Sequence, residues 1–294
     1  MKTEVLDQLT TVRDYVRYAI SRFNAASLFF GHGTSGALDE AAALVLHALH
    51  LPYDLPGGYF QSTLTRAERE SILELLTHEA PFAGHSFYVD ERVLVPRSPI
   101  AELIESEFSP WMEPEAVHRI LDMCTGSGCI AIACALQFPE ATVDAVDISA
   151  DAIEVTDINR QRLGVSDRVR SVRSDLFAGL EGERYDVIVS NPPYVSLSEW
   201  QSLPKEFHAE PRLGLESGHD GLDCVRRILE AAPEHLNDEG ILIVEVGSAA
   251  DALVEAFPEV PFCWLEFERG GDGVFLLTAE QVRAFFGASD SARH

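Results

Sequence analysis

The segment Asn191-Pro192-Pro193-Tyr194 closes a run, 185–190, whose apolar and β-branched residues predict a buried strand. Ligands of open α/β sheets bind in the crevice outside the carboxyl ends of the strands, so this segment, the NPPY loop, is expected at a ligand site. Its prolines fix φ and lack N–H donors. The Asn191 amide, the Pro192 carbonyl and the Tyr194 ring remain to accept hydrogen bonds from a planar NH2 group and stack on it. An ordinary proline turn is the alternative.

Strand and helix patterns alternate from residue 119 to residue 257. Such alternation predicts a mostly parallel sheet with helices on both faces. The end of the chain differs, because two β-prone segments, 262–267 and 274–277, flank the glycine-rich turn 270–273. This pattern predicts a hairpin whose antiparallel strand closes one edge of the sheet. The strands are predicted at 119–123, 142–147, 169–173, 185–190 and 241–246, and the helices at 129–138, 150–163, 222–236 and 249–257.

The first part of the chain has a different pattern. Residues 5–76 carry apolar positions at three- and four-residue steps, which is typical of amphipathic helices. The stretch 87–95 has a polar centre between two β-prone runs, which predicts a hairpin. We therefore expect a helical domain at 1–80 that recognises the substrate, a hairpin linker at 81–98 and a cofactor-binding domain at 99–294.

A glycine-rich turn joins the first predicted strand to the first predicted helix of that domain. Gly126 permits a tight turn and Gly128 permits a close backbone approach to a ligand. Asp147, at the end of the second strand, is placed to bind ribose hydroxyls, a role equally compatible with NAD. Asp122 before the glycines suits a cationic ligand better than a pyrophosphate. Asp175 is placed to accept a hydrogen bond from an adenine amine, with Leu176 or Phe177 beside the base. A helix cap or a solvated loop residue is the alternative for each acid.

Composition restricts the partners and the compartment. The 294 residues carry a formal net charge of −26, which repels phosphate backbones and favours basic partners. A solvated acidic surface without a partner is the alternative. The five cysteines, Cys124, Cys129, Cys134, Cys224 and Cys263, lack disulfide spacing, and no signal peptide or membrane-spanning run is evident. We expect a cytoplasmic protein without a bound metal or a membrane partner.

With these positions assembled, the chain resembles the protein glutamine-amide methyltransferases of the class I S-adenosylmethionine-dependent fold. The resemblance is closest at 87–100, 121–133, 191–195 and 266–275. Within this family it is most similar to the branch that acts on large-subunit ribosomal protein three, because 96–102 reads Pro-Arg-Ser-Pro-Ile-Ala-Glu where release-factor enzymes read Pro-Arg-Pro-Glu/Asp-Thr-Glu. One departure is a short segment near 76–81, which lacks an element that such enzymes carry.

The resemblance implies a seven-stranded sheet, S-adenosylmethionine as methyl donor with S-adenosylhomocysteine as product, and a basic ribosomal protein as substrate. It implies catalytic roles for Asn191, Pro192 and Tyr194, with Pro193 and Arg97 also at the substrate, although a structural salt bridge is the alternative for Arg97. The implied cofactor-binding residues are Asp122, Thr125, Gly126, Gly128, Asp147, Ile148, Asp175, Leu176 and Asn191. A release-factor methyltransferase, a DNA or RNA amino-methyltransferase, an NAD oxidoreductase and a non-enzymatic ribosome-assembly factor are the alternatives. The net charge argues against duplex DNA.

Overall fold

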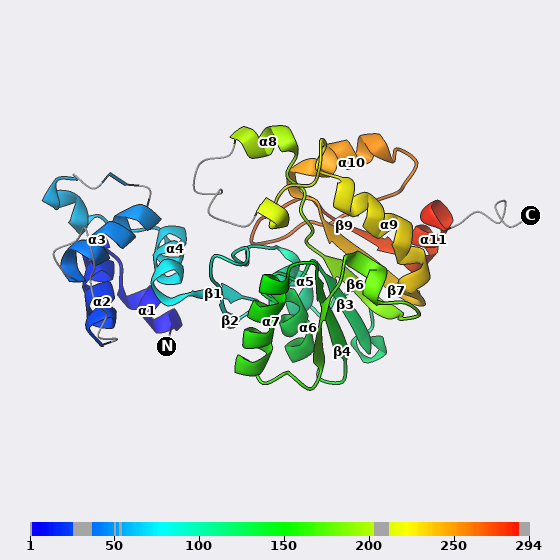
Figure 1. Cartoon of the computed structure of the whole chain (residues 1–294), viewed down its shortest axis with the longest axis horizontal. Coiled ribbons are helices and arrows are strands. Elements are labelled where there is room, and N and C mark those ends of the chain that lie inside the picture. Colours follow the sequence, from blue (N-terminus) through cyan, green and yellow to red (C-terminus); the bar gives the residue numbers. More distant parts are fainter. Residues whose placement is uncertain (1, 26–36, 50, 53–54, 203–211, 288–294) are drawn as a thin grey trace, which may run out of the picture. The chain divides into compact units, whose positions relative to one another are not determined.

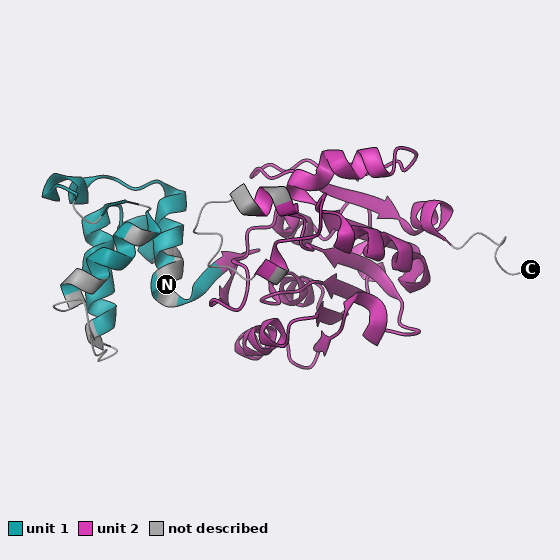
Figure 2. Cartoon of the chain, turned by 45° about the horizontal axis from the view of Figure 1, so that its top comes forward, with its two compact units in different colours: residues 1–80 teal, residues 81–294 magenta. Residues whose placement is uncertain are grey.

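The computed structural model describes residues 2–25, 37–49, 51–52, 55–202 and 212–287. The chain divides into two compact units, Met1–Ala80 and Pro81–His294 (Figure 2). Each unit has its own hydrophobic core. Among the described residues, no helix is both long and apolar enough to cross a membrane.

The smaller unit is helical. It contains α1 (Lys2–Gln8), α2 (Val12–Ala25), α3 (Ala37–Ala48), the 3-10 turn η1 (Gly57–Gln61) and α4 (Arg66–Thr77). Helix α4 starts at a reciprocal cap, in which Glu68 accepts the Thr65 backbone N–H at 2.7 Å and Thr65 Oγ1 accepts the Glu68 N–H at 3.3 Å. Fully buried side chains such as Tyr15, Val45 and Ile72 fill the space between the helices.

A hairpin follows, but not where the sequence pattern predicted it. The paired strands are β1 (Glu79–Phe82) and β2 (His85–Tyr88), joined by Ala83 and Gly84, which both have positive φ. The prediction of a hairpin centred in 87–95 was wrong. Asp90 accepts hydrogen bonds from the Tyr88 hydroxyl at 2.8 Å and from the Arg92 backbone at 3.1 Å, and these local contacts fold the chain into a turn after Tyr88.

The larger unit contains a seven-stranded sheet in the order β5-β4-β3-β6-β7-β9-β8 (Figure 1). The parallel strands are β3 (Arg119–Met123), β4 (Thr142–Asp147), β5 (Val169–Arg173), β6 (Tyr185–Ser190) and β7 (Leu236–Glu245). Strand β9 (Val274–Thr278) is antiparallel to both β7 and β8 (Cys263–Trp264). The predicted mostly parallel sheet and its C-terminal hairpin are thus confirmed, with β9 inserted between β7 and the edge strand β8.

Helices cover both faces of this sheet. Alternate residues of one strand enter opposite cores: Ile241 and Ile243 pack on one side, and Leu242 and Val244 on the other. Helices α5 (Ile100–Glu105) and α6 (Cys129–Gln137) contribute to the first core, and α7 (Ala150–Arg162) packs against α6, β4 and β5. The second core includes side chains from α9 (Asp223–His235), α10 (Ala250–Ala256) and α11 (Ala279–Phe286). The short helix α8 (Leu197–Ser202) follows the NPPY loop.

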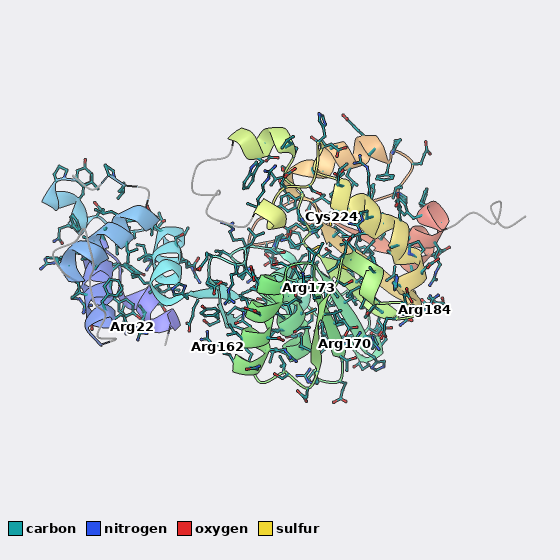
Figure 3. All side chains as sticks on the ribbon, viewed as in Figure 1. Arg22, Arg162, Arg170, Arg173, Arg184 and Cys224 are labelled. Carbon is teal, nitrogen blue, oxygen red and sulfur yellow. The ribbon has the colours of Figure 1, made fainter. Side chains whose placement is uncertain are left out.

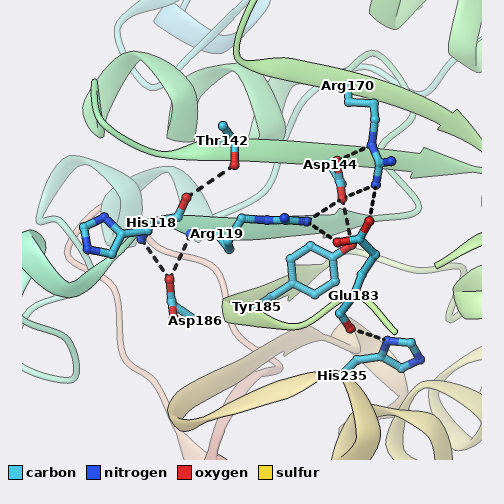
Figure 4. A network of polar contacts seen from close by, with 9 residues as sticks. All are labelled: His118, Arg119, Thr142, Asp144, Arg170, Glu183, Tyr185, Asp186 and His235. Carbon is cyan, nitrogen blue, oxygen red and sulfur yellow. Dashed lines mark hydrogen bonds and ion pairs between the residues drawn. The ribbon is translucent and has the colours of Figure 1, made fainter. Parts of the chain in front are cut away.

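A polar network ties together the ends of the strands where β3 and β6 begin (Figure 4). Asp144 is 5% exposed and accepts hydrogen bonds from the Tyr185 hydroxyl and from Arg170, each at 2.7 Å. Arg119 bridges Asp144 and Glu183, with the shorter contact, 2.8 Å, to Glu183. The network satisfies a buried carboxylate at the end of the sheet opposite the carboxyl ends of the parallel strands.

Candidate active site

A cavity of about 440 Å³ lies in the larger unit, where the parallel strands end. Strand β3 leads into the glycine-rich turn, β4 ends at Asp147, β6 leads into the NPPY loop and β7 ends at Glu245. All but two of the residues predicted for the site line this cavity: Arg97, Thr125, Gly126, Asp147, Ile148, Asp175, Leu176, Asn191, Pro192, Pro193 and Tyr194. The exceptions are Asp122 and Gly128.

Asp122 lies beneath the glycine-rich turn and holds its shape. The side chain is fully buried, and Oδ2 accepts hydrogen bonds from Thr125 Oγ1 at 2.5 Å and from the Ala131 N–H at 3.0 Å. Burial raises the pKa of this carboxyl group to about 7. Oδ1 is buried without a hydrogen-bond partner among the described residues. Asp122 therefore shapes the turn from below and keeps one acceptor unused.

Gly128 has a packing role. It adopts φ 79°, and a Cβ atom there would lie 2.8 Å from Cγ2 of Thr156 on α7. The hydroxyl of Thr156 in turn donates to the Gly126 carbonyl at 3.0 Å. The glycine is therefore needed for close contact between the turn and α7, whereas we had expected it to permit approach to the ligand. Gly126, with φ 57°, is the glycine that faces the cavity.

Asp147 connects the end of β4 to the glycine-rich turn. Its Oδ2 accepts the Gly126 N–H at 3.0 Å and its Oδ1 accepts the Ser149 N–H at 2.9 Å. Burial raises the pKa of this carboxyl group. A carboxylate has about four acceptor positions, so each oxygen can still accept one hydrogen bond from a ligand. The geometry suits two neighbouring hydroxyl groups, such as those of a ribose.

The adenine-binding position was predicted at Asp175 and Leu176. Both line the cavity, and Asp175 forms an ion pair with Arg227 of α9 at 2.9 Å. Leu176 adopts a positive φ of 49° at the start of a short 3-10 turn (Leu176–Gly179) and is 8% exposed. Arg227, which the sequence patterns did not indicate, is well placed to fix the orientation of the Asp175 carboxylate.

The backbone of the NPPY loop is held from two directions. Val195 pairs with Glu216, with its N–H donating to Leu215 at 2.8 Å and its carbonyl accepting the Ser217 N–H at 3.0 Å. Gly221 lies so close that a Cβ atom there would be 2.2 Å from the Tyr194 carbonyl oxygen. These contacts fix the loop at the cavity.

The sequence patterns did not identify Glu245, which lies beside the NPPY loop. Its side chain is 6% exposed, and Oε2 accepts a hydrogen bond of 2.5 Å from Ser98 Oγ. Tyr194 and Asn191 also lie close enough to this carboxyl group for hydrogen bonding from them to lower its pKa. An acid within the apolar run Ile-Leu-Ile-Val-Glu-Val, at the end of the strand next to β6, was the available signal.

Among the described residues that line the cavity, carboxylates outnumber guanidinium groups. The charged residues in its lining are Asp147, Asp175, Glu216, Asp223 and Glu245 against Arg92, Arg97 and Arg227. An anionic surround favours a cationic ligand over a pyrophosphate. Together with the hydroxyl-binding geometry of Asp147, it fits S-adenosylmethionine, which carries a sulfonium, an ammonium and a ribose.

Two thiols lie side by side in the cavity wall. Cys124 follows β3 and Cys224 lies in the first turn of α9, near the centre of the larger unit (Figure 3). Their sulfur atoms are 3.9 Å apart. Cys129 and Cys134 are buried, and Cys263 is half-buried in the edge strand β8. All five thiols are free.

Comparisons with known proteins identify the reaction class. The family described as "Methyltransferase small domain" matches residues 108–220. The crystal structure of the hMettl16 catalytic domain in complex with a MAT2A 3'UTR hairpin has a TM-score of 0.53 at 16% identity, covering 76% of this chain and 82% of that one. This likeness supports the fold. The methyltransferase assignment overturns the NAD oxidoreductase alternative.

Two relatives match over nearly their whole length. The protein named ribosomal protein uL3 glutamine methyltransferase from Neisseria meningitidis serogroup A is 50% identical over 297 aligned residues, 96% of this chain and 97% of its own. Its namesake from Neisseria gonorrhoeae is also 50% identical, covering 96% of this chain and 99% of its own. The chain is therefore an S-adenosylmethionine-dependent methyltransferase, and it belongs to the ribosomal protein uL3 glutamine methyltransferase family.

Proposed function

We propose that this enzyme methylates the side-chain amide nitrogen of a glutamine in ribosomal protein uL3. The observation that supports the proposal best is the NPPY loop, which lines the same cavity as the glycine-rich turn and Asp147. The relatives that share half of the sequence carry the name of this activity.

The loop would hold the substrate amide through acceptors. Asn191 Oδ1 and the Pro192 carbonyl each accept one N–H of a planar NH2 group, and the Tyr194 ring packs against the plane. An amide nitrogen is a poor nucleophile, because its lone pair is delocalised into the carbonyl. Fixing the nitrogen in one orientation supplies what solution lacks and can be worth several kcal/mol.

Cofactor binding falls to the opposite part of the cavity. Asp147 would accept the ribose hydroxyls, Asp175 the adenine amine, and Thr125 and Gly126 would border the aminoacyl end. Leu176 and Ile148 would flank the adenine base. S-adenosylmethionine supplies an electrophilic methyl group on a sulfonium. A separate base need not act first, because the amide proton becomes strongly acidic as the nitrogen gains its bond to carbon.

The choice of a ribosomal protein as substrate rests on the net charge of the chain as well as on its sequence relatives. A net charge of −26 favours a basic protein such as a ribosomal protein and disfavours direct binding of duplex DNA. We assign substrate recognition to the helical unit, residues 1–80, because it has a core separate from the sheet. Since the substrate is made in the cytoplasm, the enzyme is expected there.

Label transfer tests the proposal. The purified enzyme is incubated with tritiated S-adenosylmethionine and equal amounts of unmethylated uL3, a release factor and duplex DNA, and mass spectrometry locates the methyl group. We expect label on a glutamine of uL3 alone. Label on the release factor or on DNA would keep the chemistry and overturn the substrate. Asn191→Ala should nearly abolish transfer while cofactor affinity stays close to wild type, and wild-type turnover would refute the role of Asn191.

Removing residues 1–80 separates recognition from cofactor binding. The remaining unit, residues 81–294, contains both cores that flank the sheet and every residue of the cavity. It should bind S-adenosylmethionine with wild-type affinity, measured by calorimetry after circular dichroism has verified folding, and lose transfer to uL3. Full transfer by this variant would place recognition in the larger unit.

A further inference from the structure

The active site contains a buried acid to which the proposed mechanism has given no function. Glu245 ends β7, and the register of β6 with β7 pairs Ser190 with Val244, so Asn191 and Glu245 are the next residues on neighbouring strands. The Glu245 side chain accepts a hydrogen bond from Ser98 and lies close enough to Asn191 and Tyr194 for both to lower its pKa. It is the point at which β7, the segment before α5 and the NPPY loop meet.

The chemistry of these partners restricts their orientation. An ionised carboxylate only accepts hydrogen bonds, whereas an asparagine amide donates through nitrogen and accepts through oxygen. Asn191 can therefore contact ionised Glu245 only through Nδ2–H. This contact leaves Oδ1, the atom needed to accept the substrate N–H, for the cavity. A neutral carboxyl group has an O–H that can donate to Oδ1, which would allow the amide to rotate by a half-turn and present its NH2 group to the substrate.

We propose that ionised Glu245 is a positioning residue that fixes the Asn191 amide with its oxygen toward the substrate glutamine. Glu245 does not touch the reacting atoms in this assignment and acts through Asn191. The proposal rests on the proposed function of Asn191 as substrate acceptor. It also accounts for Ser98, whose hydroxyl donates to Glu245 and stabilises the ionised form.

The acid is poised to change its charge near neutral pH. Burial raises the pKa of Glu245 to about 7, opposed by hydrogen bonds from Ser98, Tyr194 and Asn191. Tyr194 stays neutral across this range, because burial raises its pKa to about 12. Among the described residues, Arg97 and Glu199 also act on this part of the site, both through Tyr194. Glu245 is therefore the group whose ionisation should control the Asn191 amide.

Three variants of the full chain separate positioning from packing. Glu245→Gln keeps the shape of the side chain but can donate to Asn191 Oδ1, and we expect kcat for uL3 methylation to fall about 100-fold with little change in KM or in the Kd for S-adenosylmethionine. Glu245→Asp keeps the charge and should restore part of kcat. Glu199→Gln is the matched control, because it also removes a carboxylate near Tyr194. The Glu199 carboxylate accepts a hydrogen bond from Ser248 Oγ at 3.1 Å, and kcat of this variant should stay near wild type.

The dependence of kcat on pH is a second measurement, which a loss of packing at Glu245 would not change. Wild-type kcat should rise with pH to a plateau, with a midpoint near 7, and Glu245→Asp should keep a rising limb. The residual kcat of Glu245→Gln should be flat between pH 6 and pH 8. A Glu245→Gln enzyme with kcat within twofold of wild type, or with the wild-type pH profile, would overturn the proposal.

A measurement without turnover separates this inference from the proposed function. In protein labelled with ¹⁵N-asparagine, the side-chain NH2 signal of Asn191, assigned by its loss in Asn191→Asp, should titrate with a midpoint near pH 7. The same signal should not titrate in Glu245→Gln. A signal that does not move in wild type refutes the control of Asn191 by Glu245, even if uL3 is methylated. A titrating signal in an enzyme that leaves uL3 unmethylated supports this control and refutes only the proposed substrate.

Discussion

Gly247 lies directly against the ring of Tyr194, so that a Cβ atom on the glycine would be 2.6 Å from Cε2 of the tyrosine. Backbone contact of this kind leaves the ring a single position. It also explains why position 247, two residues after Glu245, is a glycine. The aromatic wall of the proposed amide site is thus set by the segment that follows β7 as well as by the NPPY loop itself.

Gly247→Ala should displace the Tyr194 ring. We expect kcat for methyl transfer to fall at least tenfold, while the Kd for S-adenosylmethionine changes less than twofold, because Gly247 does not line the cavity. Gly182→Ala is the matched control, since Gly182 also has a positive φ, 76°, but a Cβ atom there meets nothing within 4 Å. Both variants should lose about 1 kcal/mol of stability from backbone strain, and only Gly247→Ala should lose activity. Equal kcat values for the two variants would contradict the contact.

Asp147→Asn should weaken cofactor binding. Both carboxylate oxygens of Asp147 accept backbone N–H groups, from Gly126 and Ser149, so the amide nitrogen of asparagine must face one of these donors. We expect the Kd for S-adenosylmethionine, measured by calorimetry, to rise at least tenfold, by about 1.4 kcal/mol. Asp186→Asn serves as control, because Asp186 accepts two backbone N–H groups at the start of β6 and lies outside the cavity. An unchanged Kd in Asp147→Asn would exclude Asp147 from the cofactor site.

Much of this site could be predicted because it depends on where strands end. The limits of β3, β4, β5 and β6 coincide with the predicted strands. Strands β3, β4 and β6 are mostly buried, whereas β5 is a partly exposed edge strand in which valines recur between polar residues. Because these segments follow parallel strands, the glycine-rich turn, the acids after β4 and β5 and the NPPY loop were expected to meet at the carboxyl ends of the strands.

The remaining features depend on which strands are neighbours and in which register. Glu245 lies beside Asn191 because β6 is next to β7 with Ser190 opposite Val244. Asp122 was expected to face the ligand, but its contacts with Thr125 and Ala131 turn it beneath the loop. Helix α11 was not predicted, although Thr278 and Gln281 form the reciprocal cap that the pattern Thr-x-x-Gln indicates.

Cofactor binding should protect two thiols from alkylation. Cys124 and Cys224 line the cavity, whereas Cys263 lies in β8 away from it. Saturating S-adenosylhomocysteine should slow the reaction of Cys124 and Cys224 with a maleimide at least tenfold, as followed by mass spectrometry of peptides. Cys263 is the internal control, and its rate should not change. Unprotected Cys124 and Cys224 would place the cofactor elsewhere.

The polar network around Asp144 should contribute stability and no activity. Asp144→Ala would leave the buried Tyr185 hydroxyl without its acceptor, which costs about 2 kcal/mol, whereas the partly exposed Arg119 and Arg170 keep their contacts with Glu183. Urea unfolding should show this loss, with an unchanged Kd for S-adenosylmethionine. Asp238→Ala is the matched control, because Asp238 pairs with Arg283 at 3.1 Å while its side chain is 93% exposed, and its removal should leave stability within error.

Glu245→Gln should make the enzyme more stable at high pH while making it slower. The pKa of Glu245 in the folded protein, about 7, lies above its ordinary value of 4.5. The folded state therefore favours the neutral acid, and the stability that this group contributes is complete below about pH 4.5 and lost as the pH rises through 7. Glutamine is neutral at every pH and avoids this loss. Urea titrations at pH 5 and pH 8 measure the free energy of unfolding of Glu245→Gln and of wild type. We expect the difference between the two proteins to favour Glu245→Gln more strongly at pH 8 than at pH 5. The same difference in free energy at both pH values would show that Glu245 carries no buried charge in the active enzyme.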